Sequence, residues 1–377
     1  MKIGIVCPYN IFKGGGVQEY ALGLRNSLVA NGHKAFVITP QPMDYDGPKV
    51  PGIIMIGGAA PIRSFHTSAQ VSASVDTDAL EAVLREQNFD ILHFHEPWVP
   101  MLSRQILSRS DAIHIATFHA AMSERWTART LERVITPYTK SILKYLDVLT
   151  AVSPVATNYI KTLTHRKIYI IPNAIDIEKY QQKDKQAANP QKNKKTILYV
   201  GRLEKRKAVK YLIQAFGAIN QVHKRYHLII AGEGPDRDRL EEQIKESDIN
   251  NVTFLGHIDE AEKINLLQSC DVFCSPAMYG ESFGIVLLEA MAAGCVTVAG
   301  ANAGYESVLT GSGQISLVNP KDTKDFARRL LLMASDDGLR QHWLGWAENE
   351  VSKYSYQNIV NQYMKLYELA YTKKHHE

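Results

Sequence analysis

Short apolar runs rich in β-branched residues alternate with longer segments whose apolar residues recur at helical spacing, through both halves of the chain. This alternation predicts parallel strands joined by covering helices, and therefore an α/β fold with a Rossmann-like sheet in each half. The strands predicted for the first half are residues 3–7, 35–39, 91–94, 113–118, 148–152 and 168–171, and those for the second half are residues 197–200, 227–231, 252–255, 272–275 and 296–299.

A polar segment separates the two halves. Residues 181–195 are rich in Gln, Lys and Asn and hold no apolar residue larger than Ala. Such a segment cannot contribute to a hydrophobic core, so it is predicted to link a domain of residues 1–180 to a domain of residues 196–354. Apolar positions at helical spacing then predict a terminal helix over residues 356–371, within a C-terminal segment of residues 355–377.

The length and composition of the chain disfavour several classes of protein. A chain of 377 residues exceeds what one core usually supports, and a net charge of +4 is too small to indicate a nucleic-acid partner. The four cysteines show no paired spacing typical of zinc sites, and no apolar run approaches the roughly 20 residues of a membrane span. The N-terminal apolar stretch is too short for a signal peptide, so we expect a cytoplasmic protein whose membrane contact, if any, is peripheral.

Two carboxylates eight residues apart, Glu281 and Glu289, bracket the start of an apolar, helix-forming run. A helix start presents unpaired N–H groups and the positive end of its dipole, which suit phosphate, while carboxylates accept hydrogen bonds from sugar hydroxyls. The pair therefore indicates a nucleotide sugar, with Glu281 on the hexose and Glu289 on the ribose. The alternative is that Glu281 is a capping acid and Glu289 a solvated helix residue.

Groups suited to phosphate also follow the first strand of each half. Residues 14–16 are three glycines between a strand and a helix, where positive φ angles would let a phosphate approach the backbone closely. In the second half, Arg202 and Lys207 are predicted to neutralise a diphosphate, with a solvated charge run as the alternative. No GxGxxG motif is present and the second strand does not end in an acid, which disfavours an NAD-dependent dehydrogenase.

Histidines and paired acids give two further predictions. His119 stands just past a strand, at the edge where open α/β sheets bind ligands, whereas His93 is expected to be a packing residue. The acidic triplets that begin at Asp76 and Asp236 precede helical patterns, so they are predicted to cap helices rather than to bind a metal.

On these residues the chain resembles the family 4 retaining glycosyltransferases of GT-B fold, and among them the bacterial phosphatidylinositol mannosyltransferases. The resemblance covers nearly the whole chain. It implies two Rossmann-like domains that face each other across a cleft, the first binding the acceptor and the second the nucleotide sugar, with the C-terminal helix returning to the first domain. The matching stretches are Cys7-Pro8-Tyr9, Gly15-Gly16-Val17-Gln18, His93-Phe94-His95-Glu96-Pro97, Ala116-Thr117-Phe118-His119, Ile171-Pro172-Asn173, Gly201-Arg202 and residues 280–293.

The resemblance also implies roles for individual residues. The family retains anomeric configuration without an established enzymic nucleophile, so the leaving diphosphate is expected to help deprotonate the incoming hydroxyl. No metal or other essential cofactor is implied beyond the nucleotide-sugar donor. The implied residues are His119, Glu281, Arg202 and Lys207 for catalysis; Gly15, Gly16, Arg202, Lys207, Ile258, Lys263, Glu281, Ser282, Phe283, Gly284, Ile285 and Glu289 for the donor; and Tyr9, Gln18, Trp98 and Glu124 on the acceptor side.

We therefore expect a hexosyltransferase that moves mannose from GDP-mannose to a lipid or lipid-linked acceptor. Trp98, Ala120, Ala121 and Glu124 depart from the mannosyltransferase pattern, which weakens the case for phosphatidylinositol as the acceptor. One alternative is an enzyme that uses UDP-glucose or UDP-N-acetylglucosamine and acts on a diacylglycerol, a small molecule or a polysaccharide. The others are a sugar-nucleotide epimerase and a catalytically silent nucleotide-sugar sensor.

Residues 122–146 predict a peripheral contact with an anionic membrane surface. Three arginines recur there every four positions, and two lysines repeat that step beyond Pro137, beside apolar side chains. A basic amphipathic segment of this kind binds anionic lipid, and the alternative is the solvent face of an ordinary buried helix. The basic residues are Arg125, Arg129, Arg133, Lys140 and Lys144, and the apolar ones are Trp126, Leu131, Val134 and Ile135.

Overall fold

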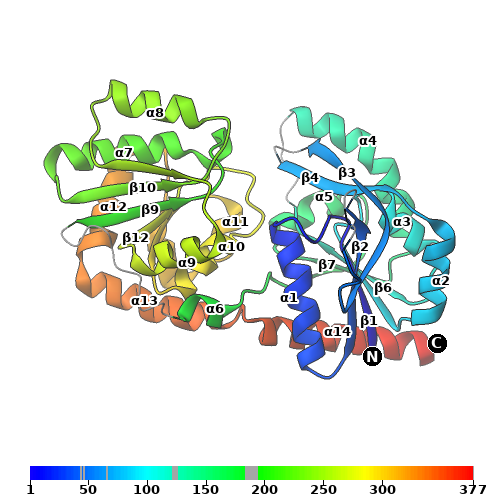
Figure 1. Cartoon of the computed structure of the whole chain (residues 1–377). Helices are drawn as coiled ribbons and strands as arrows, with labels where there is room; N and C mark the ends of the chain where they lie inside the picture. Colours follow the sequence, from blue (N-terminus) through cyan, green and yellow to red (C-terminus); the bar gives the residue numbers. More distant parts are fainter. Residues whose placement is uncertain (43–44, 46, 65–66, 121–125, 183–193, 377) are drawn as a thin grey trace. The chain divides into compact units, whose positions relative to one another are not determined.

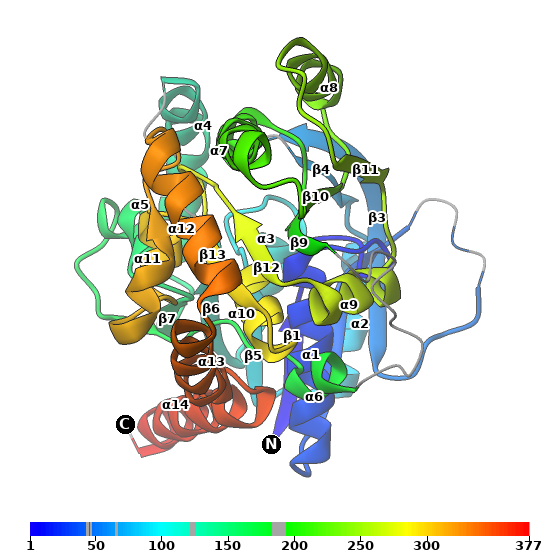
Figure 2. The ribbon, with the colours of Figure 1, turned by 90° about the vertical axis from the view of Figure 1, so that its left-hand side faces the viewer.

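The computed structural model describes residues 1–42, 45, 47–64, 67–120, 126–182 and 194–376. The chain folds into two compact units, the first formed by Met1–Ala174 with Tyr356–Glu377 and the second by Ile175–Ser355. Each unit contains one mainly parallel sheet with helices packed against it (Figure 1), which confirms the predicted α/β class. Both chain ends lie on the first unit, where they can be followed in Figure 2.

The sheet of the first unit has eight strands in the order β4-β3-β2-β1-β5-β6-β7-β8. The six predicted strands are present within two residues of their expected ends. The antiparallel pair β3 and β4 was not predicted. Residues 53–56 form a short apolar run, which is the signal that could have found β3, whereas the rest of the pair is rich in Gly, Ala and Ser. The strands are β1 (Lys2–Val6), β2 (Lys34–Gln41), β3 (Ile53–Ser64), β4 (Thr67–Ser74), β5 (Ile91–His95), β6 (Ile113–Phe118), β7 (Val148–Ala151) and β8 (Ile168–Ile170).

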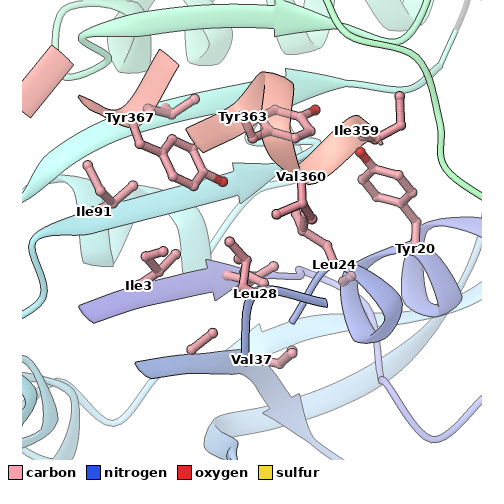
Figure 3. Close-up of a cluster of buried hydrophobic side chains, with 14 of the residues drawn as sticks. Ile3, Tyr20, Leu24, Leu28, Val37, Ile91, Ile359, Val360, Tyr363 and Tyr367 are labelled. Carbon is pink, nitrogen blue, oxygen red and sulfur yellow. The ribbon is translucent and has the colours of Figure 1, made fainter. Parts of the chain in front are cut away.

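Helices α1 (Gly16–Ala30) and α14 (Tyr356–His376) pack together on one face of this sheet (Figure 3). Their buried residues recur at helical spacing, as the sequence predicts for residues 356–371. The C-terminal helix therefore returns to the first unit. The remaining helices of this unit are α2 (Thr77–Gln87), α3 (Leu102–Leu107), α4 (Trp126–Leu143) and α5 (Asn158–Lys161), and the shared core includes Ile3, Tyr20, Leu24, Leu28, Ile91, Ile359, Val360, Tyr363 and Tyr367.

Hydrogen bonds between side chains also fix α14 on the sheet. The hydroxyl of Tyr367 lies 2.7 Å from Nδ1 of His93, and that of Tyr363 lies 3.1 Å from Oγ1 of Thr117. Nε2 of His93 lies 2.6 Å from the same Thr117 hydroxyl. His93 is fully buried and has partners on both ring nitrogens, which confirms the prediction that it is a packing residue.

The second unit has a six-stranded sheet in the order β11-β10-β9-β12-β13-β14. The five predicted strands are present, and the short β14 was not predicted. Strand order reverses between β9 and β12, the position at which open α/β sheets bind ligands. The elements are β9 (Lys195–Val200), β10 (Tyr226–Ala231), β11 (Val252–Gly256), β12 (Val272–Ser275), β13 (Val296–Gly300), β14 (Leu317–Val318), α6 (Ile177–Gln181), α7 (Val209–Val222), α8 (Arg237–Glu246), α9 (Glu260–Ser269), α10 (Ile285–Ala292), α11 (Ala303–Glu306), α12 (Thr323–Ser335) and α13 (Asp337–Ser352).

The units divide a few residues before the predicted boundary. Residues 175–180, which the sequence places in the first domain, cluster with the second unit. Within α6, Tyr180 donates a hydrogen bond to Oε1 of Glu260 over 3.0 Å, and Gln268 donates to the Tyr180 carbonyl over 2.7 Å. Most of the predicted linker, residues 183–193, lies outside the described residues.

Only one of the two acidic triplets begins with a residue whose side chain caps a helix. Oδ1 of Asp76 accepts a hydrogen bond from the Ala79 N–H over 3.0 Å and caps α2, as predicted. Asp236 precedes α8 but its side chain makes no capping bond, so the prediction is wrong for this residue. The reason is its helical backbone (φ −93°, ψ −1°), because a capping side chain usually requires an extended residue.

Candidate functional site

The loops that follow β9 and β12 meet at the carboxyl edge of the second unit's sheet. These strands are neighbours, so their ends bring the short helix Lys205–Lys207 close to the segment before α10. The Met278 N–H donates to the Arg206 carbonyl over 3.0 Å and joins the two loops. The basic run and Glu281 thus share one site.

Glu281 lies at the centre of an ion cluster. Its Oε1 is 2.6 Å from Nη1 of Arg206 and 2.8 Å from Nζ of Lys207. Arg206 also places its Nε 2.6 Å from Oε1 of Glu204. Burial alone would lower the pKa of Arg206, but the carboxylates of Glu281 and Glu204 raise it. These two contacts fix the orientation of the Glu281 side chain.

Arg206 is a site residue that the sequence prediction missed. The predicted pair was Arg202 and Lys207; Lys207 does contact Glu281, whereas the Arg202 side chain is exposed. The signal was present, because Arg206 lies in the same basic run. Residues 202–207 with Glu281 hold four cations and two carboxylates, so positive charge is in excess, as a diphosphate requires.

Helix α10 begins at Ile285, four residues after Glu281. Gly284 precedes it with φ 126°, and a Cβ there would lie 2.9 Å from the ring of Tyr305, so this turn needs glycine. Ser282 and Ile285 are half-buried, whereas Phe283 is buried with its ring centroid 5.7 Å from that of Tyr354. Contacts of Phe283 with a donor would therefore come from its backbone.

Glu289, one turn into α10, is part of a second ion cluster. Its Oε1 is 2.9 Å from Nζ of Lys263, and Lys263 is also 2.9 Å from Oε2 of Glu260. Burial alone would lower the pKa of Lys263, but Glu289 and Glu260 raise it. Burial alone would raise the pKa of Glu260, but hydrogen bonds from Lys179 and Lys263 lower it to about 2.

Glu289 is only 8% exposed, so the alternative of a solvated helix residue is wrong. Ile258, also predicted on the donor side, is half-buried just before α9.

The glycine loop of the first unit differs from its prediction. Gly15 precedes α1 with φ 169°, and none of residues 14–16 adopts a left-handed backbone. The expected positive φ angles are therefore wrong for this loop. The N–H groups at the start of α1 remain the groups suited to phosphate, beside the exposed Gly16.

The predicted acceptor residues differ in how deeply they are buried. Tyr9 and Gln18 are half-buried on the first unit. Trp98 is 7% exposed, with its ring centroid 6.1 Å from that of Tyr159, so it belongs mainly to the packed interior. Glu124 lies outside the described residues.

His119 follows β6 and is held on both ring nitrogens. Its Nε2 lies 2.8 Å from Nδ1 of His95, and its Nδ1 lies 3.1 Å from Oδ1 of Asn173. Burial lowers the pKa of His119 to about 4, although the bond to Asn173 opposes the shift. The imidazole is therefore neutral at physiological pH.

Glu96, which follows β5, is a second feature that the sequence prediction did not assign. Its Oε1 accepts hydrogen bonds from the backbone N–H groups of His119 and Ala120, each over 2.6 Å. Burial raises the pKa of Glu96 to about 8, although these two bonds oppose the shift. The residue stands inside the His-Glu-Pro stretch that carried part of the resemblance, which is the only signal that could have found it.

Two family models match the chain in succession. The model described as Glycosyltransferase Family 4 matches residues 14–179, and the model described as Glycosyl transferases group 1 matches residues 180–348. The phosphatidyl-myo-inositol mannosyltransferase of Mycolicibacterium smegmatis is 32% identical over 371 residues, which cover 98% of this chain and 94% of that protein. The chain belongs to the family 4 glycosyltransferases.

Other comparisons agree with this family. The phosphatidyl-myo-inositol mannosyltransferase of Mycobacterium leprae is 30% identical over 374 residues, covering 99% of the glycosyltransferase and 98% of the relative. The sucrose-phosphate synthase of Thermosynechococcus elongatus is similar in structure, with a TM-score of 0.78, 20% identity and 99% coverage of both chains. Anabaena Alr3699/HepE with UDP and glucose has a TM-score of 0.74 at 18% identity, covering 97% and 99% of the two chains. These structures show that the fold is GT-B.

The described part of this glycosyltransferase contains neither a candidate metal site nor a candidate membrane span. Within those residues, no group of three or more His, Cys, Asp and Glu side chains could hold a metal ion. No described helix is both long and apolar enough to cross a membrane. In the segment that predicts membrane contact, residues 121–125 lie outside the description; farther along, Lys140 and Lys144 are exposed, whereas Ile142 is buried.

Proposed function

We propose that this glycosyltransferase moves mannose from GDP-mannose to a lipid or lipid-linked acceptor, with retention of anomeric configuration. The observation that carries the proposal is the carboxylate pair of the second unit, in which Lys207 holds Glu281 and Lys263 holds Glu289. Mannose and a lipid acceptor are supported by the full-length similarity to proteins named phosphatidyl-myo-inositol mannosyltransferases.

The two ion clusters suit different parts of a sugar nucleotide. Both cations on Glu281 contact Oε1, so we assign its Oε2 to a hydroxyl of the transferred hexose. Glu289 is assigned to the ribose hydroxyls, with Ile258 and Lys263 beside the nucleotide. The diphosphate is assigned to Arg202, Lys207 and the N–H groups at the start of α10, because cations and helix N-termini both stabilise phosphate charge.

Catalysis would then rest on positioning and charge stabilisation. As the bond between sugar and diphosphate breaks, negative charge grows on the leaving oxygen, where the cations of residues 202–207 stabilise it. The leaving diphosphate accepts the proton of the incoming acceptor hydroxyl on the same face of the sugar. His119, neutral and held by two partners, is assigned to the transferred sugar. No metal is needed in this scheme.

The acceptor is assigned to the first unit, with Tyr9, Gln18, Trp98 and Glu124 as candidates, whereas Gly15 and Gly16 are assigned to the donor. We place the protein in the cytoplasm, with residues 122–146 touching the inner face of the membrane. The exposed Lys140 and Lys144 support this contact, since each basic residue near an anionic surface contributes roughly 1 kcal/mol.

The proposal is tested by measuring nucleoside diphosphate release from GDP-mannose, UDP-glucose and UDP-N-acetylglucosamine, with and without vesicles containing phosphatidylinositol or diacylglycerol. GDP release that rises with vesicles, together with a mannosylated lipid of unchanged anomeric configuration, is the expected result. UDP release instead would replace the donor. Epimerised donor without diphosphate release would indicate an epimerase, and donor binding without any release would indicate a sensor. Glu281→Ala serves as the inactive control.

A further inference from the structure

A buried carboxyl at the end of β5 holds the backbone that carries His119. Oε1 of Glu96 accepts both the His119 and the Ala120 N–H, each over 2.6 Å. Glu96 is 2% exposed, and its other oxygen, Oε2, has no hydrogen-bond partner among the described residues. One oxygen of the side chain therefore accepts hydrogen bonds from two consecutive peptide groups of one loop.

This arrangement is costly for folding, so stability alone does not explain it. A buried carboxyl without a cation is disfavoured in its ionised form, and burial accordingly raises the pKa of Glu96 to about 8. The backbone of Glu96 is also left-handed, with φ 48°, which non-glycine residues rarely adopt. Unfavourable burial and backbone strain in one residue are typical of functional sites.

The same contacts connect Glu96 to the His119 ring. The Glu96 N–H donates to the Thr117 carbonyl over 2.9 Å, so the ends of β5 and β6 are joined in both directions. Directly beyond this junction, the His119 ring reaches His95 and Asn173. A shift of the His119 backbone would break that pair of ring contacts.

We infer that Glu96 is a positioning residue for glycosyl transfer, whose Oε1 fixes the peptide groups of His119 and Ala120 and so holds the His119 ring in place. The inference rests on the proposed role of His119. Glu96 itself does not contact the reacting atoms in this scheme. What it supplies is a pair of accepting bonds in a fixed place, which a neutral amide oxygen supplies equally well.

The chain offers a conservative variant and a matched control. In Glu96→Gln the amide oxygen can accept both N–H bonds, and the new NH2 replaces an oxygen that has no described partner. Glu96→Ala removes both bonds. Asp147→Ala is the control, because Asp147 accepts one N–H bond, from His114 over 2.7 Å, at the opposite end of β6.

Turnover is measured with whichever donor the wild-type enzyme uses, so a wrong donor assignment changes the substrate and leaves the comparison intact. We expect Glu96→Ala to lower kcat on the order of 100-fold with little change in donor KM, since mispositioning of this kind acts on the transition state. Glu96→Gln should keep kcat within about threefold, and Asp147→Ala should leave the kcat of the folded enzyme unchanged. Amide hydrogen exchange at His119 and Ala120 should speed up in Glu96→Ala and stay slow in Glu96→Gln.

Combining variants decides whether Glu96 acts through His119. His119→Ala with Glu96→Ala should lose no more kcat than His119→Ala alone, because coupled residues are non-additive. Additive losses would overturn the inference, as would wild-type kcat in Glu96→Ala. Loss of kcat in Glu96→Gln with slow amide exchange would also overturn it, since the acid itself would then act on substrate. Should Glu96→Ala fail to fold, Glu96→Asp, with a shorter reach, takes its place under the same criteria.

Discussion

Nδ1 of His95 lies 2.8 Å from Nε2 of His119, and these two nitrogens share one proton between two neutral rings. Oδ1 of Asn173 accepts from the other side, so Nδ1 of His119 carries its proton and Nε2 accepts from His95. The tautomer of His119 is therefore set by its neighbours. A ring fixed in this way presents its edge, rather than a mobile acid or base, to a ligand.

Replacement of Asn173 by Asp tests this arrangement. A carboxylate 3.1 Å from Nδ1 would favour the imidazolium, so the pKa of His119 should rise from about 4 by at least one unit. The pKa is followed by NMR titration of the His119 ring proton. Asn173→Ala is the comparison and should not raise it; an unchanged pKa in Asn173→Asp would show that the contact is not made.

Removal of the Arg206 guanidinium should reduce donor turnover while the fold is retained. Arg206→Ala leaves Glu281 with Lys207 and removes a charge-assisted bond, so kcat/KM should fall on the order of 10- to 100-fold. Steady-state kinetics and donor titration measure the loss. Arg237→Ala is the control, because Arg237 also pairs with two carboxylates but lies on exposed α8; equal losses in both variants would refute a specific role for Arg206.

A methyl group at Gly304 should displace the backbone of Glu281. A Cβ there would lie 2.2 Å from the Glu281 carbonyl oxygen, which backbone atoms cannot avoid without moving. Gly304→Ala should therefore weaken donor binding by about tenfold or more, as measured by calorimetry. Gly345→Ala, where no atom lies within 4 Å of the added Cβ, should leave donor binding unchanged. Normal donor binding in Gly304→Ala would show that donor binding does not depend on the position of the Glu281 backbone.

The hydroxyl of Tyr367 should stabilise the first unit. Tyr367→Phe leaves Nδ1 of the buried His93 without its partner, which should lower the free energy of unfolding by roughly 1–3 kcal/mol. Urea unfolding followed by signals of the first unit measures the change. Tyr371→Phe, one turn later on α14 and half-buried, should have little effect. Equal stability of Tyr367→Phe and the wild type would contradict the prediction.

The buried histidines should make the first unit sensitive to acid. Folding lowers the pKa of His119 to about 4 and that of His93 to about 3, from 6.5 in the unfolded chain. Between pH 6.5 and pH 4 the unfolded chain binds more protons at His119 than the folded chain does. The contribution of neutral His119 to the free energy of unfolding is therefore fully present above pH 6.5 and is lost as the pH falls toward 4. The His119 share is roughly 3 kcal/mol. In His119→Gln, unfolding free energies measured from pH 7 to pH 4 should decline less steeply; an equal decline would rule out His119 as a source.

Local patterns in the sequence determined much of the fold. Runs of β-branched residues gave the parallel strands of both sheets, because such strands are buried on both faces and read as continuous apolar segments. Helical spacing gave α14 and its buried face. In the hairpin of β3 and β4, the apolar residues 53–56 carry the strand pattern but were not used for the prediction, and the small residues that follow carry neither pattern.

The chemical site was only partly readable in the same way. Glu281 and Glu289 were recognisable because they lie close together along one helix start. Which cation meets Glu281 was decided by the junction of two loops about 75 residues apart, where the Met278 N–H bond brings Arg206 rather than Arg202 inward.

The sequence by itself therefore determined the element types, the two-sheet architecture and the carboxylate pair, because these depend on short-range periodicity. Only the tertiary structure decided that α6 packs on the second unit, that Arg206 holds Glu281 and that Glu96 holds the His119 backbone. Each of these contacts joins segments 23 or more residues apart. Their partners are selected by packing geometry and by the need to satisfy buried polar groups, which local sequence does not encode.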